Sequence, residues 1–491
     1  MLSKSSYLRG LQCHKNLYFH KNRPDLKPQI GAAQQRIFDQ GTNVGELAQQ
    51  LFPGGVDCTP EDYSQLGTAV EQTQRLIADG TKVIYEAAFV YDDVFVALDI
   101  LVKEEDGWHA YEVKSSTNLK PVNLDDMAVQ YYVITGSGLP LVDISLVHIN
   151  TAYVLEGELD AQQLFTKDSR IEEVKERQLL VHAKVAELKA MLNSNKEPKV
   201  NIGPHCSDPY SCEFQHHCWK NIPEKSVFDV SGLWGTKKWE LMEQGILDMA
   251  DIPDSYPLNA AQRMQVEAER SGESTIDHER IQDFVGSLNY PLVYLDFETM
   301  APAVPMLQGC SPYQRTVFQY SVHIEQEDGT VTHKEYLAPK GPADYREAMI
   351  RQLIEDCGEV GDVIVYNVSF EEGCLQELAT AFTNYWVPLN DIIQRLVDLM
   401  VPFQKKWYYT PEMQGSHSIK YVLPALAPEF SYQDLNVQEG QTASAVFASY
   451  FEGNYEGDEE QLRKDLLAYC ELDTLAMVEI LRVLRHGTQD A

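Results

Sequence analysis

Runs of apolar and polar positions predict two separate groups of strands and helices along the chain. In the first half, three short apolar runs separated by acidic turns are followed by a stretch with helical spacing and one more apolar run; these are 82–91, 94–102, 108–114, 124–136 and 142–150. This order predicts a β-β-β-α-β arrangement over residues 82–150. Helical character then extends over residues 158–193 and ends at the polar sequence NSNKEPK.

The second half begins with LVYLDFET at 292–299, an apolar run ending in acids that is typical of a buried central strand. Strands and helices then follow in turn: we expect strands at 316–325 and 330–338, a helix at 342–357, a strand entering a helix at 362–370, and a final helix at 462–485. Strands followed by alternating helices and strands predict an α/β domain with a mixed sheet. Residues 225–290 are predicted to be helical and connecting.

Length and charge narrow the class of protein. A chain of 491 residues exceeds the length at which one core stops growing, so several domains are expected. No apolar run approaches the roughly 18 residues of a membrane span, and the first residues lack a secretory signal, so we expect a cytoplasmic protein that does not use a membrane. The net charge of −34 argues against a protein that coats nucleic acid, although residues 1–27 form a local basic arm.

Carboxylates in the second half are spaced for a metal site. Asp296 and Glu298 lie two apart on a strand and therefore share a face, while Tyr469 and Asp473 lie four apart on a helix and share a face there. Two divalent ions need several carboxylate oxygens, and a tyrosine beside an acid can orient the attacking water. Between these two pairs in sequence, a predicted strand delivers Asn367, Phe370 and Glu371 to the start of a helix.

The order D-x-E, N-x-x-F-E and Y-x-x-x-D, in which Asn367 and Phe370 precede Glu371, resembles the DEDD exonucleases of the ribonuclease-H-like fold, in the variant that uses tyrosine. That resemblance implies hydrolysis of phosphodiester bonds from the 3′ end with Mg²⁺ or Mn²⁺. The family usually has aspartate at the position of Glu371, so the resemblance implies Glu371 as the third acid, with Asp398 as the alternative. His417 is interpreted as an ordinary loop histidine.

A second set of charged residues lies in the first half. Asp99 ends one predicted strand, and Glu112 and Lys114 share one face of its neighbour. An acid pair can hold a divalent ion while a lysine polarises the scissile phosphate. The spacing D-x12-E-x-K, followed by Gln130 on a helix, resembles the PD-(D/E)XK nucleases of the RecB branch, which implies a restriction-endonuclease-like fold that cuts DNA.

One ligand of that family departs from the pattern here. The place expected for its upstream histidine holds Gly45, with Glu46 beside it. Either Glu46 or Glu86 is the alternative source of the missing ligand.

Four of the nine cysteines have a spacing of interest. Cys206, Cys212 and Cys218 follow at six-residue steps, and Cys13 lies far upstream. Thiolates suit iron–sulphur clusters or zinc. One cysteine before the nuclease core and three after it resemble the iron–sulphur RecB-type nucleases, including the CRISPR-associated exonuclease and the AddB nuclease domain, which implies a [4Fe-4S] cluster. The alternative is zinc, with one histidine from His205, His216 and His217. The other cysteines are expected to be buried and inert: Cys58, Cys310, Cys357, Cys374 and Cys470.

Together these resemblances divide the chain into a RecB-like PD-(D/E)XK domain with an iron–sulphur staple at 1–220, a helical linker at 221–284 and a ribonuclease-H-like DEDD exonuclease domain at 285–491. The combination resembles a bacterial family of two-nuclease proteins. It implies a metal-dependent nuclease acting on DNA, with RNA as the alternative substrate, in DNA repair or defence against mobile elements, with a helicase or defence-system partner. The alternatives are a nucleic-acid-binding protein whose N-terminal domain is a degenerate grip, and a nuclease subunit of a helicase–nuclease complex. The chain lacks a G-x-x-x-x-G-K-[ST] phosphate loop, so any motor would be a partner.

Overall fold

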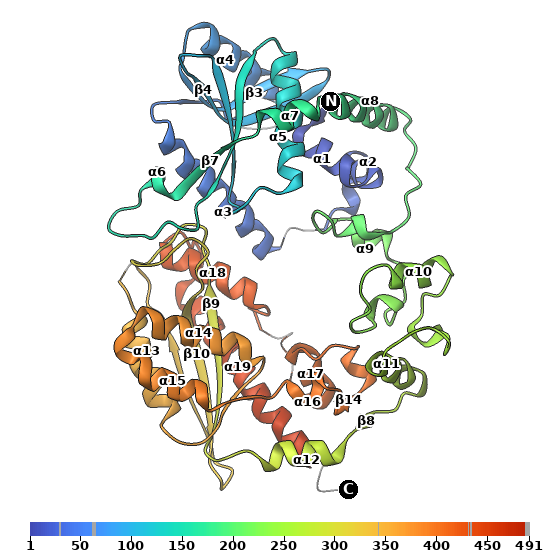
Figure 1. Cartoon of the computed structure of the whole chain (residues 1–491), viewed down its shortest axis with the longest axis vertical. Helices are drawn as coiled ribbons and strands as arrows, with labels where there is room; N and C mark the ends of the chain where they lie inside the picture. The colour runs from blue at the N-terminus through green and yellow to red at the C-terminus, as the bar shows by residue number, and fades with distance from the viewer. Residues whose placement is uncertain (29–30, 61–64, 342, 431, 433–434, 487–491) are drawn as a thin grey trace. The chain divides into compact units, whose positions relative to one another are not determined.

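The computed structural model describes residues 1–28, 31–60, 65–341, 343–430, 432 and 435–486. The chain forms two compact units, each of which combines helices with strands (Figure 1). Unit 1 contains Met1–Asn221 and Pro302–Tyr313, and unit 2 contains Ile222–Ala301 and Gln314–Ala491. Within the described part of the chain, no helix is both long and apolar enough to cross a membrane.

Unit 1 is built on a seven-stranded mixed sheet in the order β2-β3-β4-β5-β6-β7, with β1 beside β4. The strands are β1 Leu2–Ser3, β2 Val56–Asp57, β3 Val83–Tyr91, β4 Val94–Lys103, β5 Trp108–Lys114, β6 Leu141–Ile149 and β7 Phe165–Ser169. Strands β3, β4 and β5 form an antiparallel meander, and β6 joins β5 in parallel after the crossover helix α5 (Pro121–Gly136). The β-β-β-α-β prediction for this region is confirmed.

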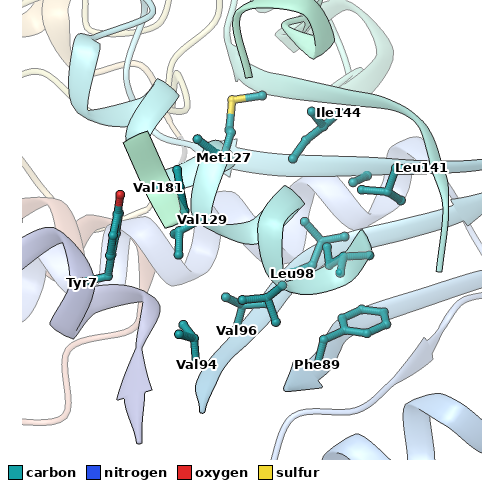
Figure 2. Close-up of a cluster of buried hydrophobic side chains, with 14 of the residues drawn as sticks. Tyr7, Phe89, Val94, Val96, Leu98, Met127, Val129, Leu141, Ile144 and Val181 are labelled. Atoms are coloured by element: carbon teal, nitrogen blue, oxygen red, sulfur yellow. The ribbon is translucent and has the colours of Figure 1, made fainter. Parts of the chain in front are cut away.

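The other α-helices of unit 1 are α1 Lys4–Gln12, α2 His14–Asn22, α3 Ala32–Ala48, α4 Leu66–Ala78, α6 Ala161–Leu164, α7 Ile171–Glu176, α8 Gln178–Asn193 and α9 Gln215–Cys218. Figure 2 shows the core between α5 and the sheet, which includes Met127 and Val129 of α5 and Val96 and Leu98 of β4. Helical character over all of 158–193 was wrong in its first part. Residues 165–169 instead pair with β6 as the antiparallel strand β7, because β6 offers an open edge there.

Unit 2 contains a five-stranded mixed sheet in the order β11-β10-β9-β12-β13. Its strands are β9 Leu292–Met300, β10 Thr316–Glu325, β11 Val331–Leu337, β12 Val363–Val365 and β13 Leu396–Asp398. The central strand β9 is antiparallel to β10 and parallel to β12, which confirms the predicted buried central strand and mixed sheet. Because β9, β12 and β13 run the same way, their carboxyl ends meet at one edge.

The α-helices that follow β11 are α13 Arg346–Cys357, α14 Val368–Ala381, α15 Trp386–Gln394, α16 Val401–Gln404, α17 Ile419–Leu426, α18 Gly440–Glu452 and α19 Glu459–His486. Helices α13 and α19 lie on opposite faces of this sheet. The predicted start of α13 includes Pro342, which lies outside the described residues. Alternation along β10 explains the layering: the Gln319 side chain donates to the Leu466 carbonyl of α19, whereas Tyr320 turns the other way and donates to Asp356 of α13.

Residues 222–291 belong to unit 2 and contain α10 Lys237–Glu243, α11 Ala260–Ser271, α12 His278–Gly286 and β8 Thr275–Ile276, which pairs with β14 Tyr408–Tyr409. Val227, Leu241 and Val266 are fully buried in a small core of their own. The segment predicted as a linker is therefore packed structure. Conversely, the segment Pro302–Tyr313, which follows β9 in the sequence, belongs to unit 1. There the Leu155 N–H donates to the Cys310 carbonyl at 3.0 Å.

Candidate functional site

Strand β9 and helix α19 bring three carboxylates of unit 2 together. Asp296 and Glu298 lie on the face of β9 that α19 covers, and Asp473 comes from α19. One carboxylate oxygen of each residue lies within 4.8 Å of the others. Glu298 and Asp473 are each only 8% exposed. The structure thus gathers the residues that the sequence predicted as metal ligands.

Burial and mutual repulsion make this cluster hold protons tightly. Burial, and then Asp473, raise the pKa of Asp296 well above its usual range, and burial with Asp296 does the same for the pKa of Glu298. Burial raises the pKa of Asp473 to about 6, although hydrogen bonding favours its ionised form. Buried carboxylates that repel one another are stabilised when protons or a bound cation neutralise their negative charge.

Glu371 lies in the first turn of α14 and faces the same cluster. Its side chain is 1% exposed, and Oε2 has no hydrogen-bond partner. Burial, followed by the charge of Asp296, raises the pKa of Glu371 to about 9. A buried oxygen without a partner on a carboxyl group near Asp296 fits a divalent-ion ligand, because buried polar atoms are otherwise nearly always bonded.

Asp398, the alternative third acid, is used differently. Its carboxylate accepts the backbone N–H groups of Asn367 at 3.1 Å, Val368 at 3.2 Å and Met400 at 2.9 Å. Asn367 begins α14 with a positive φ of 85°, so Asp398 holds an unusual turn in place as well as the helix start. This capping role separates Asp398 from Glu371.

Two side chains that the sequence analysis did not single out, Tyr432 and Lys420, lie near Asp473 together with the predicted Tyr469. The Tyr432 hydroxyl donates to Asp473 Oδ1 at 2.6 Å, and Tyr469 also hydrogen bonds to this carboxylate. Lys420 of α17 has its Nζ atom 5.7 Å from the ring centroid of Tyr432 and 5.6 Å from that of Tyr469. Its charge lowers the pKa of both Glu298 and Asp473. The sequence SIKY, which contains Lys420, has no pattern that predicts a position beside the carboxylate cluster.

Cys470, expected to be inert, is fully buried beside the cluster. Its Sγ atom lies 3.6 Å from Oδ2 of Asp296, and burial, then Asp296, raise the pKa of this thiol well above its usual value. It therefore stays a neutral thiol that packs against the carboxylate. His417 precedes α17, and its carbonyl accepts the Tyr366 hydroxyl at 2.7 Å.

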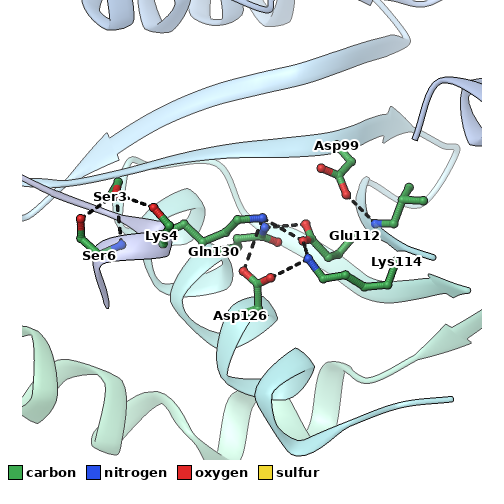
Figure 3. Close-up of polar contacts among 10 residues, drawn as sticks. Ser3, Lys4, Ser6, Asp99, Glu112, Lys114, Asp126 and Gln130 are labelled. Carbon is green, nitrogen blue, oxygen red and sulfur yellow. Dashed lines mark hydrogen bonds and ion pairs between the residues drawn. The ribbon is translucent and has the colours of Figure 1, made fainter. Parts of the chain in front are cut away.

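In unit 1 the structure also brings the predicted Asp99, Glu112, Lys114 and Gln130 together (Figure 3). Glu112 is fully buried; its Oε2 accepts the Gln130 amide at 2.6 Å, and its Oε1 accepts Lys114. Asp99 Oδ2 accepts the backbone N–H of Val113 at 2.5 Å.

Two members of this cluster were missed. The Lys4 ammonium lies 2.8 Å from Glu112 Oε1 and 3.4 Å from Asp126 Oδ1, and Lys114 lies 2.8 Å from Asp126 Oδ2. Asp126 is one helical turn before Gln130 on α5, a spacing that could have indicated it. Of the alternative ligands, Glu86 is close enough for Lys4 to lower its pKa against the effect of burial, whereas Glu46 is exposed on α3.

The four selected cysteines, Cys13, Cys206, Cys212 and Cys218, line one cavity in unit 1 and are all free thiols. Burial, followed by nearby Cys13, Cys206 and Cys218, raises the pKa of Cys212 to about 11. Of the alternative zinc ligands, His205 lines the same cavity, whereas His216 and His217 do not appear in its lining. Zinc would hold tetrahedral sulphurs roughly 3.8 Å apart. Among the described residues, no cysteine belongs to a group of three or more possible metal ligands whose ligand atoms all lie within 4.8 Å of one another.

These features define a mixed α/β protein of more than one domain, with a buried carboxylate cluster in one unit and a thiol-lined cavity in the other. Residues 293–418 match the family model of a domain of unknown function, DUF2779. The chain is 30% identical over 222 residues to the uncharacterised protein UU173 of Ureaplasma parvum, covering 40% of this chain and 32% of that protein. It is also 30% identical over 211 residues to the MG366 homologue of Mycoplasma pneumoniae, covering 38% of this chain and 31% of that protein. The match thus spans about a third of these relatives.

Proposed function

We propose that this protein is a metal-dependent nuclease whose unit 2 removes nucleotides from the 3′ end of DNA, with RNA as the alternative substrate. The observation that carries this proposal is the cluster of Asp296, Glu298 and Asp473, together with buried Glu371, which interacts with Asp296 and has one oxygen without a partner. Among the described residues, no lysine or arginine forms an ion pair with any of the four. Such a set suits two hard divalent ions.

The donor set suggests how the site would act. Mg²⁺ or Mn²⁺ held by these carboxylates would supply an activated water and stabilise the leaving oxygen. Tyr469 is positioned by its hydrogen bond to Asp473 to orient that water, and burial keeps its hydroxyl protonated by raising its pKa. Lys420 adds a positive charge beside Glu298 and Asp473 that can attract the phosphate backbone.

The test is digestion of single-stranded DNA and RNA, labelled at either end, by the full chain with Mn²⁺ or Mg²⁺. Asp296→Asn should lower the rate of release from the 3′ end by more than about 100-fold, because it removes a shared ligand. Asp328→Asn, which changes an exposed turn acid in the same unit, is the matched control and should act like the parent. Equal rates for Asp296→Asn and the parent would disprove the assignment.

For unit 1 we propose a [4Fe-4S] cluster on Cys13, Cys206, Cys212 and Cys218, supported by their shared cavity. A cubane binds each thiolate through a different iron, which suits sulphurs spaced more widely than around one zinc ion. Such a cluster would tie α1–α2 to the segment after α8. The second candidate function is nucleic-acid binding by unit 1 without cleavage, favoured by the ion pairs that already occupy Glu112.

A further inference from the structure

The charged cluster of unit 1 contains a lysine that its resemblance to PD-(D/E)XK nucleases does not explain. Lys4 comes from α1, about a hundred residues before Glu112, yet its ammonium lies 2.8 Å from Glu112 Oε1 and 3.4 Å from Asp126 Oδ1. Figure 3 shows its side chain extending between α1 and the sheet toward these two carboxylates. The cluster therefore has two lysines where a metal-dependent site needs one.

The backbone around Lys4 is held on both sides. Leu2 and Ser3 form β1 beside the start of β4, and the Ser3 side chain accepts the Ser6 N–H at 3.2 Å as the N-cap of α1. The Lys4 side chain is only 22% exposed. Because strand pairing and the helix cap fix the backbone, Lys4 is delivered into the cluster and does not sample solvent like a surface lysine.

The contacts leave Glu112 without a free oxygen for a metal. Oε1 is shared by the two lysines, and Oε2 accepts Gln130. Asp126 likewise has one oxygen toward each lysine, and its buried Oδ1 has only the 3.4 Å ion pair with Lys4 and no hydrogen bond.

We propose that the ammonium of Lys4 occupies the place of the divalent ion in unit 1, so that Lys4, Glu112, Lys114 and Asp126 form a closed ion-pair network beside Asp99 and not a metal-dependent cutting site. Unit 1 then contributes binding and structure, and cleavage belongs to unit 2. A divalent ion enters unit 1 only when the positive charge of Lys4 is removed.

The test measures Mn²⁺ binding to the full chain by calorimetry and by electron paramagnetic resonance, with the unit 2 site disabled by Asp296→Asn and Asp473→Asn. In this background we expect no Mn²⁺ whose binding depends on Glu112. Adding Lys4→Gln should create one such site. Its affinity for Mn²⁺ should exceed that of the background chain by more than about tenfold, because a repelling charge within contact distance of the ion is lost. Adding Glu112→Gln should abolish the site.

Two controls separate this effect from general changes in charge. Lys189→Gln removes another lysine of unit 1, paired with Asp92, and should create no Mn²⁺ site. Lys4→Arg keeps the charge and should create none either. A Lys4→Gln chain that is folded by circular dichroism but binds no additional Mn²⁺ would overturn the proposal.

If Lys4→Gln does not fold, the chain that carries only Asp296→Asn and Asp473→Asn still tests the proposal. Mn²⁺ bound to that chain and lost with Glu112→Gln alone would show that Lys4 does not take the place of the ion. The absence of such binding would support the proposal. Because the unit 2 ligands are disabled throughout, none of these outcomes depends on the nuclease assignment of unit 2.

Discussion

The Tyr432 hydroxyl donates a 2.6 Å hydrogen bond to Oδ1 of Asp473, joining a residue before α18 to the middle of α19. This bond favours the ionised form of Asp473 and opposes the effect of burial on its pKa, which is raised to about 6. The metal site that we propose would therefore depend near neutral pH partly on a tyrosine outside the recognised motif.

Tyr432→Phe should move the acid limb of the activity profile to higher pH by about one unit. Loss of the hydrogen bond raises the pKa of Asp473 further, and only its ionised form is a good metal ligand. Activity should fall most around pH 6 to 7 and approach the parent value at higher pH. Tyr366→Phe, which removes a tyrosine bond to the His417 carbonyl, is the control. A loss of equal size at every pH would contradict this explanation.

Glu371→Gln and Asp398→Asn should affect different properties. Glu371→Gln removes a charged donor next to Asp296 and should weaken Mn²⁺ binding by about 10- to 100-fold while leaving the metal-free chain at least as stable. Asp398→Asn should cost about 1 kcal/mol of folding free energy by weakening the cap of α14, with Mn²⁺ affinity kept. Calorimetry and denaturant unfolding measure the two effects. The reverse result would make Asp398 the third acid.

The stabilisation of the protein by Mg²⁺ or Mn²⁺ should increase with pH. Both Glu371 and Asp473 have folded pKa values raised above their ordinary ones, to about 9 and about 6, so the folded state binds more protons than the unfolded state over this range. The metal-free fold consequently loses stability as pH rises from about 4 toward 9. A divalent ion replaces those protons, so the increase in Tm that it causes should be larger at about pH 8.5 than at about pH 5.5.

Thermal unfolding of the parent with and without Mg²⁺ at both pH values measures this difference. Glu371→Gln removes the group with the pKa of about 9 and should reduce the pH dependence. Equal increases in Tm at both pH values would mean that the cluster does not hold the ion.

Anaerobically purified protein should be brown and contain about four irons per chain. Cys206→Ser removes a thiol that lines the shared cavity and should abolish both colour and iron, while Cys58→Ala changes a buried cysteine elsewhere in unit 1 and should leave both unchanged. Iron analysis and visible absorption provide the measurements. Colourless protein that contains only zinc would exclude the cluster.

Local periodicity was sufficient for part of this picture. Alternation along a strand already placed Asp296 and Glu298 on one face, and the helical repeat placed Tyr469 beside Asp473. The meander and crossover helix of unit 1 were likewise readable, because long apolar patterns of fixed period are local properties of the chain. The short polar strand β7 was missed, since it becomes a strand only by pairing with β6.

Other features depend on segments that meet only in the folded chain. Glu371 and Asp398 both follow parallel strands to the same edge of the sheet, and only the capping bonds of Asp398 distinguish their roles. Lys4 reaches Glu112 across about a hundred residues, and no periodic pattern in the sequence reports such a contact. The sequence by itself therefore determined which residues share a strand or helix face, whereas tertiary packing decided which charges meet and which carboxylates remain free for a metal, because burial and pairing depend on contacts between distant segments.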